Sequence, residues 1–424
     1  MELSDHLFRR EAGRMVSTVT RIFGVHNLAL AEDVVQDAFC RALEVWKFRG
    51  VPENPSAWLM TTAKNRAVDI LRRERTARTF APELGRLLES EWTLVPTVEE
   101  QFAASAIKDD QLRMMFSCCH PELSTEAQVT LILKTLCGFS VSEIAHALLA
   151  SEDSIEKRLG RARKLFRLSG TFVEIPNASD IPKRLEPVYQ AIYLLFNEGY
   201  HGSRSEPKVR EDLCLEAIRL SLLLYEHPAG ENPKTHALLA LLCFHAARLP
   251  GRIDEEGDLI QLEMQDRSKW DRDLIAKGFH FLEKSSMGNE LSEYHLEAGI
   301  ASLHCLARSY EEIDWAKILE LYDVLYRIRP SPIVALNRAV ALGNARGPEE
   351  GLTELSKIPD RAKLKDYPFY PAAQGEFHFL AGRPDEAAKH FEGAMKLARS
   401  RSETNFFERK LKACRLGAAQ INDR

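Results

Sequence analysis

The chain has 424 residues, enough for two to four domains and a large hydrophobic core. Its 45% hydrophobic and 28% charged residues exclude a disordered or collagen-like chain, and its net charge of −5 argues against a general nucleic-acid binder. The eight cysteines include no CxxC pair, which excludes a zinc ribbon and favours free thiols in a reducing compartment. With no signal peptide at the start and no apolar run of about 18 residues, we expect a cytoplasmic protein without membrane contact.

The net charge conceals two basic segments. Residues 61–80 hold six basic and two acidic side chains, and residues 151–170 hold six basic and three acidic ones. The rest of the chain carries 45 basic against 57 acidic residues. Local basic stripes on an acidic body favour contact with phosphate or an acidic partner, although a solvated helix face is the ordinary explanation of either stripe alone.

Apolar residues recur at three and four positions almost throughout, which predicts an all-α chain. Prolines and weaker periodicity divide it into a first helical domain, a linker, a second helical domain and a long helical extension. The expected ranges are 1–75, 76–123, 124–170 and 182–424.

Within the first domain, residues 31–46 have the pattern of an amphipathic helix. The polar face of this helix contains Asp33, Gln36, Asp37, Arg41 and Glu44. Its apolar stripe is expected to contain Val34, Val35, Ala38, Phe39, Ala42, Leu43 and Trp46.

The next helix is expected to begin with Asn54 as N-cap and Pro55 in its first turn. Amide and guanidinium groups on one helix face can bond both phosphates and base edges, so this helix is a candidate for nucleic-acid contact. Its predicted core face contains Leu59, Ala63, Ala67, Ile70 and Leu71. The polar row that could contact nucleic acid contains Asn65, Asp69 and Arg72, with Arg66 and Arg73 beside it.

The second domain carries the more specific pattern. A capping box, Ser140 with Glu143, opens a short helix, and Ser151 caps a following helix rich in arginine and lysine. A helix, a short turn and a basic helix predict a helix-turn-helix, whose second helix enters the major groove. An ordinary helical hairpin with a solvated basic face is the alternative.

These segments resemble the extracytoplasmic-function (ECF) sigma factors of RNA polymerase. Ala31–Phe39 (AEDVVQDAF) resembles their polymerase-binding helix, and Ser56–Arg73 (SAWLMTTAKNRAVDILRR) their promoter-melting and minus-ten helix. Ser140–Ala145 (SVSEIA) and Arg158–Arg163 (RLGRAR) resemble the domain that binds the minus-thirty-five element. The resemblance covers about residues 4–170, and it implies core RNA polymerase and promoter DNA as partners in transcription initiation.

Site residues follow from this resemblance by position. Those implied to bind polymerase, at the clamp helices of its largest subunit, are Asp33, Gln36, Asp37 and Phe39. Those implied to contact the minus-ten region are Trp58, Asn65, Arg66, Asp69, Arg72 and Arg73. Those implied to contact the minus-thirty-five duplex are Ser154, Lys157, Arg158, Arg161 and Arg163.

The chain departs from the family pattern in two places. Leu149 stands in the turn where members often have glycine, and a left-handed conformation there costs a non-glycine residue about 1 kcal/mol. The chain also continues far beyond residue 175, like a subgroup with a tetratricopeptide-like extension, to which Phe196–Tyr200 (FNEGY) and Asp212–Leu220 (DLCLEAIRL) are similar.

The extension itself contains one good helical-repeat copy and two weaker ones. The good copy has small or aromatic residues at Gly375, Gly382, Ala387, Phe391 and Ala394. The weaker copies rest on Tyr322, Leu325 and Pro330, and on residues 334–342. Such stacks present surfaces to proteins or peptides, so the extension is expected either to regulate the two DNA-binding domains in cis or to bind an unidentified protein.

We expect no enzyme activity, because HExxH, GxxxxGK[ST], GxSxG and GxGxxG after a strand are all missing from the sequence. No cofactor or metal is expected. Cys118, Cys119 and His120 are a weak metal candidate, since adjacent cysteines seldom share one ion. The alternative function is a helix-turn-helix regulator with a helical-repeat sensor domain, which would have no use for the helix at 31–46 paired with the helix at 58–73.

Overall fold

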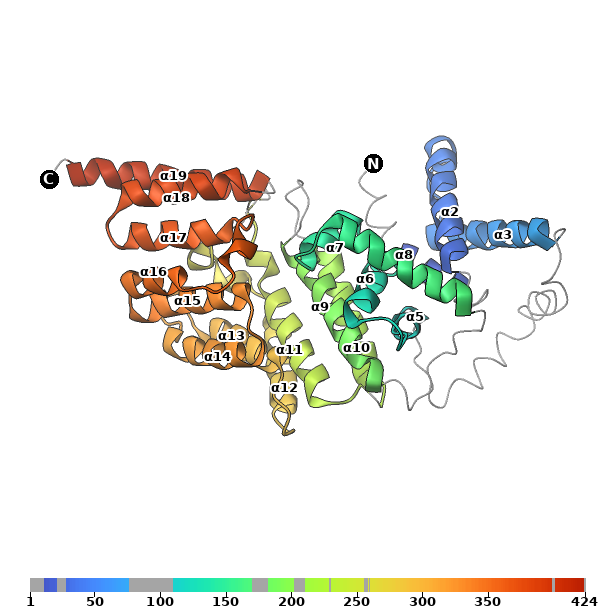
Figure 1. The fold of residues 1–424 in the computed structure, drawn as a ribbon, viewed down its shortest axis with the longest axis horizontal. Coiled ribbons are helices and arrows are strands. Elements are labelled where there is room, and N and C mark those ends of the chain that lie inside the picture. The colour runs from blue at the N-terminus through green and yellow to red at the C-terminus, as the bar shows by residue number, and fades with distance from the viewer. Residues whose placement is uncertain are drawn as a thin grey trace. The chain divides into compact units, whose positions relative to one another are not determined.

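A computed structural model of the chain describes residues 11–20, 28–75, 110–169, 182–201, 210–228, 230–254, 258, 260–398 and 401–422. Within these ranges the regular elements are α-helices and short 3-10 helices, with no β-strand (Figure 1). The prediction of an all-α fold is confirmed. Two compact units are distinguished, one comprising Met1–Leu195 with Leu222–Glu231 and the other Phe196–Ser221 with Asn232–Arg424.

In the first unit, α2 (Leu28–Arg49) and α3 (Pro55–Arg75) pack as a helical pair. The α3 N-terminus forms as predicted, because the backbone amide of Ala57 donates to Asn54 Oδ1 at 3.0 Å. Among the described side chains most of the predicted stripes are buried, while the side chain of Leu71 lies outside the described ones. Leu43 differs: it is 54% exposed, although Ala42 is fully buried and Trp46 farther along is half-buried, so Leu43 lies outside the buried part of the helix face.

The second helical domain is formed by α5 (Asp110–Cys118), α6 (Thr125–Thr135), α7 (Val141–Ala147) and α8 (Glu152–Ser169). Helix α5 lies in the segment expected to be a linker, and its Met115 and Phe116 are fully buried. The side-chain amide nitrogen of Gln111, Nε2, donates to the backbone carbonyl of Leu136 at 3.4 Å. This part of the linker therefore packs against α6 and belongs to the core of the domain.

The turn between α7 and α8 has the conformation that glycine favours, although leucine occupies it. The predicted capping box is present: Ser140 N donates to Glu143 Oε2 at 2.6 Å, and Glu143 N donates to Ser140 Oγ at 3.1 Å. At the other end of α7, Leu149 has φ 49°, while Ala150 N donates to Ala145 O at 2.9 Å. This is a left-handed C-terminal cap of the helix.

The extension begins with α9 (Leu185–His201) and α10 (Glu211–Glu226), each of which contributes residues to both units. Successive helices of the second unit pack on one another. They are α11 (Pro233–Ala247), α12 (Arg272–Ser285), α13 (Glu293–Leu306), α14 (Trp315–Ile328), α15 (Pro332–Arg346), α16 (Pro348–Ser356), α17 (Phe369–Leu380), α18 (Pro384–Lys396) and α19 (Arg401–Asn422).

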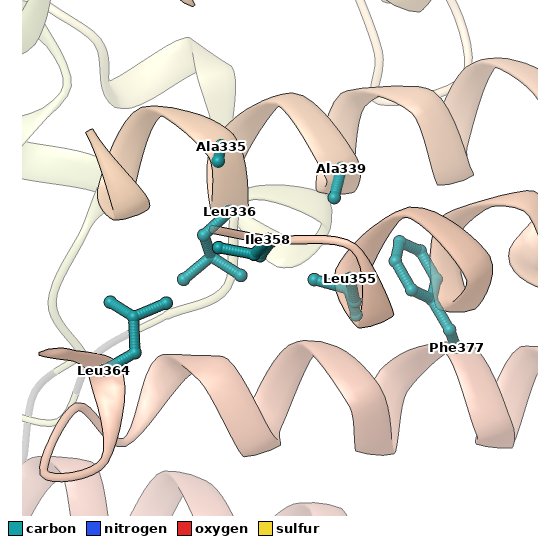
Figure 2. Close-up of a cluster of buried hydrophobic side chains, with 7 residues drawn as sticks. All are labelled: Ala335, Leu336, Ala339, Leu355, Ile358, Leu364 and Phe377. Atoms are coloured by element: carbon teal, nitrogen blue, oxygen red, sulfur yellow. The ribbon is translucent and has the colours of Figure 1, made fainter. Parts of the chain in front are cut away.

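Neighbouring helices of the second unit pack closely where a phenylalanine ring of one helix lies against a glycine of another. Phe377 points from α17 into a buried cluster with Leu336 and Leu355 (Figure 2). Its ring lies so close to Gly343 of α15 that a Cβ there would be 2.2 Å from Phe377 Cζ. In the predicted repeat copy, the Phe391 ring lies in the same way against Gly375. Small residues thus permit the close helix approach expected of a tetratricopeptide-like stack.

The last helix is tied back to a distant part of the second unit. Asn405 Nδ2 donates to both carboxylate oxygens of Asp258, at 3.0 and 2.9 Å. Arg409 adds a longer ion pair with the same carboxylate at 3.9 Å. These contacts hold α19 against the segment that follows α11.

The left-handed turn predicts an inverted preference at residue 149. We expect Leu149→Gly to be more stable than Leu149→Ala by about 0.5–1 kcal/mol, because relief of left-handed strain exceeds the backbone entropy that glycine loses. Urea unfolding of the full-length chain measures the difference.

The matched control is Gly160 of α8, which has no neighbour within 4 Å of an added Cβ. There the ordinary order should hold, with Gly160→Ala stabilising by about 0.5–1 kcal/mol. An alanine variant at 149 as stable as the glycine variant would contradict the left-handed strain.

Candidate polymerase-binding and nucleic-acid-binding surfaces

The polar face of α2 is positioned by the stripe opposite it. Val34 and Ala38 are fully buried, which turns Asp33, Gln36 and Asp37 toward solvent. Phe39 is half-buried at the edge of the stripe. Three of the four predicted polymerase-binding residues therefore form one exposed polar row.

Helix α3 presents Asn65 and Asp69 to solvent, while the Trp58 ring packs on Trp46 of α2 at 5.5 Å between centroids. Arg66 is engaged differently, since its Nε donates to Asp37 Oδ2 at 2.9 Å. The side chains of Arg72 and Arg73 lie outside the described residues. The minus-ten candidates are thus divided between an exposed polar pair, a packed ring and an arginine that contacts α2.

An exposed apolar group at the α2–α3 connection was missed by the sequence analysis. Phe48 is 84% exposed and Val51 is 54% exposed. Gly50, with φ 78°, forms the turn between them. The available signal was Phe48 itself, an aromatic residue that falls outside the periodic stripe of α2 just before a glycine and a proline.

Helix α8 presents its cations on the side opposite a buried stripe of Ile155, Leu159 and Ala162. Among the described residues, Arg158 and Arg161 form no ion pair with a carboxylate. Ser154 is half-buried, and Lys157 Nζ lies 2.7 Å from Asp153 Oδ2 in an exposed pair. The surface therefore offers two guanidinium groups, one turn apart, that are available to an anionic partner.

Arg163 is directed elsewhere. Its Nη2 donates to Glu32 Oε2 of α2 at 3.1 Å, and Thr135 Oγ1 donates to the other oxygen of Glu32 at 2.8 Å. The Glu32 side chain is 20% exposed and that of Arg163 is 40% exposed. One carboxylate thus joins the first helical domain to the second, through a residue predicted to contact DNA.

The weak metal candidate at residues 118–120 has a structural explanation. Burial raises the pKa of Cys119 to about 12 and raises the pKa of Cys118 as well, so both remain protonated thiols. His120 Nδ1 accepts from the Glu122 amide at 3.2 Å. In the described part of the chain, no three metal-ligating side chains are grouped.

Among the described helices, none has both the length and the apolar character needed to cross a bilayer.

Comparison with known families assigns three segments. Residues 7–77 match sigma-70 region 2, residues 113–166 match sigma-70 region 4, and residues 184–286 match a family of unknown function. The first match contains α2 and α3, and the second contains α6, α7 and most of α5 and α8, so together they cover the surfaces described above. The third begins at the start of α9.

The chain is similar to several bacterial proteins. An uncharacterised protein of Rhizobium meliloti (strain 1021) is 37% identical over 91% of this chain and 90% of its own length. The ferric citrate uptake sigma factor FecI of Escherichia coli is 28% identical over 39% of this chain and 90% of its own length. The ECF RNA polymerase sigma factor SigK of Mycobacterium ulcerans is 27% identical, over 35% and 80%. No solved structure matches.

Proposed function

The chain belongs to the ECF sigma factors that carry a large C-terminal extension, and on this premise we propose how its residues divide the work of initiation. A sigma factor directs transcription initiation by binding core RNA polymerase and promoter DNA, and sigma-factor families are not enzymes. We place its action in the cytoplasm, where its proposed polymerase and DNA partners are found.

We propose that the exposed row on α2 binds polymerase and that α3 and α8 contact the two promoter elements. Asp33 and Asp37 offer carboxylates to a basic surface, in charge-assisted contacts of roughly 1.5–3 kcal/mol each. Arg158 and Arg161 offer planar guanidinium groups suited to guanine O6 and N7 in the major groove. The observation that carries the proposal is that Arg158 and Arg161, on the second helix of a helix-turn-helix and opposite a buried stripe, form no ion pair with any carboxylate of the described residues.

Two sets of variants separate the two steps in run-off transcription with purified core polymerase. Asp33→Arg combined with Gln36→Ala should abolish co-purification with polymerase, because it replaces two favourable contacts with a like charge. Arg158→Ala or Arg161→Ala should leave polymerase binding intact and weaken promoter binding about 5- to 150-fold at fixed salt, equivalent to about 1–3 kcal/mol.

Asn65→Ala should instead change base preference at the downstream, melted element. Arg41→Ala, on the same polar side of α2 but paired with Glu44, is the control for the polymerase step. A footprint in which Arg158→Ala altered the downstream element, or Asn65→Ala the upstream one, would contradict the assignment of the two domains.

The contact of Glu32 with Arg163 implies a closed arrangement that promoter binding must open. The two promoter elements lie about 25 base pairs apart, which is about 85 Å along B-form DNA. Helix α3 packs on α2, so α3 and α8 cannot contact sites so far apart while Glu32 of α2 and Arg163 of α8 form a 3.1 Å ion pair. We propose that the free protein holds this closed arrangement and that binding releases Arg163 toward phosphate.

The contact of Glu32 with Arg163 and Thr135, called the latch below, is weak enough to be broken when the protein binds its promoter. A partly exposed ion pair contributes about 0.2–1 kcal/mol, and the Thr135 hydrogen bond about 0.5–1.5 kcal/mol. Glu32→Arg, which replaces attraction with repulsion, should therefore shift the free protein toward open forms by about threefold to seventyfold. Arg163→Glu added to Glu32→Arg should restore much of the closed population.

Pulsed electron spin resonance distances can measure this shift. Cys40 on α2 is the exposed cysteine while the other seven are buried, so it accepts one spin label, and Glu156→Cys on α8 provides the second. Glu44→Ala, which breaks an ion pair wholly within α2, is the matched control. Unchanged distance distributions in Glu32→Arg would disprove the latch.

We further propose that the extension regulates the sigma domains in cis, in preference to recruiting a separate protein. Two observations support this. Residues 182–195 belong to the same compact unit as the sigma domains, and Arg184 Nη1 donates to the Phe116 carbonyl of α5 at 3.1 Å. A contact within one chain has a high effective concentration and needs little intrinsic affinity.

Truncation near residue 178 should therefore change promoter-directed transcription by purified polymerase with no other protein added. Arg184→Ala in the full-length chain removes only the contact with α5 and should change transcription in the same direction by a smaller factor. Equal transcripts and equal promoter affinity for truncated and full-length forms, at several salt concentrations, would leave recruitment of a partner as the role of the extension.

A further inference from the structure

The segment of unknown function contains a cluster of arginines around Trp270. Arg248 follows the last residue of α11, and Arg267 opens the 3-10 helix η5 (Arg267–Lys269). Their guanidinium carbons lie 5.3 and 4.6 Å from the centroid of the Trp270 ring. Arg252 lies nearby, 3.6 Å above the ring of Tyr200. Loop and helix C-terminus thus bring cationic groups together on aromatic surfaces.

Several donors in the cluster have no acceptor among the described residues. One guanidinium nitrogen of Arg267, Nη1, donates to the carbonyls of His304 and Ala307 at 2.6 and 2.9 Å, which anchors this side chain. Its Nη2, the Nε of Arg248 and the Nε1 of Trp270 are buried without a partner. Arg248 is only 9% exposed and Trp270 only 3%.

The two arginines on Trp270 also lack a close counter-charge among the described residues, since Glu311 and Glu312 act on Arg267 only from beyond ion-pair distance. Within the described residues, neither Arg248 nor Arg267 lies within ion-pair distance of a carboxylate, and Arg248 Nη2 donates to the neutral side chain of Gln265, at 3.5 Å. Burial, and then the charge of Arg248, lowers the pKa of Arg267. Burial and the two arginines lower the pKa of His304 to about 3, so this ring is neutral. Buried charges in proteins are ordinarily paired, and an unpaired one is costly.

We propose that this cluster is a binding site for a phosphate group, either free phosphate or the phosphoryl group of a small metabolite. Adjacent guanidinium groups match a dianionic phosphate in charge, and their planar N–H groups match its oxygens in geometry. The partly exposed side chains of Arg252 and Arg267 connect the cluster to solvent, so an anion can approach from that side. Occupation would supply the missing counter-charge and the missing acceptors.

Calorimetric titration of the full-length chain with inorganic phosphate, at constant ionic strength, tests the site. The wild type should bind saturably, and Arg248→Met should weaken binding at least tenfold, because it keeps the packing on Trp270 while removing the charge and the donors. Arg346→Met, at an exposed arginine of α15, should leave binding unchanged and controls for general charge loss.

Stability without phosphate distinguishes this site from a merely structural cluster. In phosphate-free urea unfolding, Arg248→Met should be as stable as the wild type or more so, because it removes an uncompensated buried charge. A lower unfolding midpoint with unchanged phosphate affinity would overturn the proposal, as would absence of saturable binding to the wild type. If Arg248→Met does not fold, Arg248→Lys, which keeps the charge but loses the planar fork, should still weaken binding.

Three further titrations identify the anion. Acetate or citrate binding as tightly as phosphate would overturn the choice of phosphate. A phosphomonoester that binds more tightly than inorganic phosphate would identify a metabolite as the source, and the reverse order would identify the free ion. The alternative to a bound anion is a counter-charge from the chain itself, for which Glu255 and Glu256, acidic residues outside the described ranges, are the candidates. Phosphate binding that appeared only after their joint replacement by glutamine would show that the chain supplies its own counter-charge and would overturn the proposal.

Discussion

Helices α2 and α8 must each bury one apolar stripe, and this requirement orients the surfaces proposed to meet polymerase and DNA. In α8, the buried Ile155, Leu159 and Ala162 force Arg158 and Arg161 outward. In α2, the buried Val34 and Ala38 do the same for Asp33 and Gln36. Because the described chain contains no sheet to carry binding groups, the polar face opposite each of these stripes is the surface that we propose for polymerase or DNA.

Local rules predicted much of the fold and of these surfaces. Capping by Asn54 and the box of Ser140 with Glu143 depend on residues three apart, so the sequence reveals them directly. The buried stripes follow from helical periodicity in the same way. The prediction that Leu43 belongs to the stripe was wrong, because periodicity does not show how much of the width of the α2 face is covered by its neighbours.

Contacts between distant residues could not be predicted. Glu32 meets Arg163 across 131 residues, and no periodic pattern distinguishes Arg163 from the other cations of α8. The arginines around Trp270 likewise come from a helix end and a separate 3-10 helix. Asp37 and Arg66 illustrate a further consequence, because they were assigned to different partners yet form one ion pair. A substitution at either residue therefore alters the electrostatic surroundings of both proposed interfaces.

The contact between Asp258 and Asn405 closes a ring of chain 147 residues long, which gives the protein a fixed order of maturation on the ribosome. An open stack of repeats can fold piece by piece as it emerges, but this ring cannot close until α19 has been synthesised. At roughly 5–20 residues per second, synthesis reaches α19 some 12–50 seconds after the end of α8. The helix-turn-helix can thus fold and meet DNA on a nascent chain well before the C-terminal unit is complete.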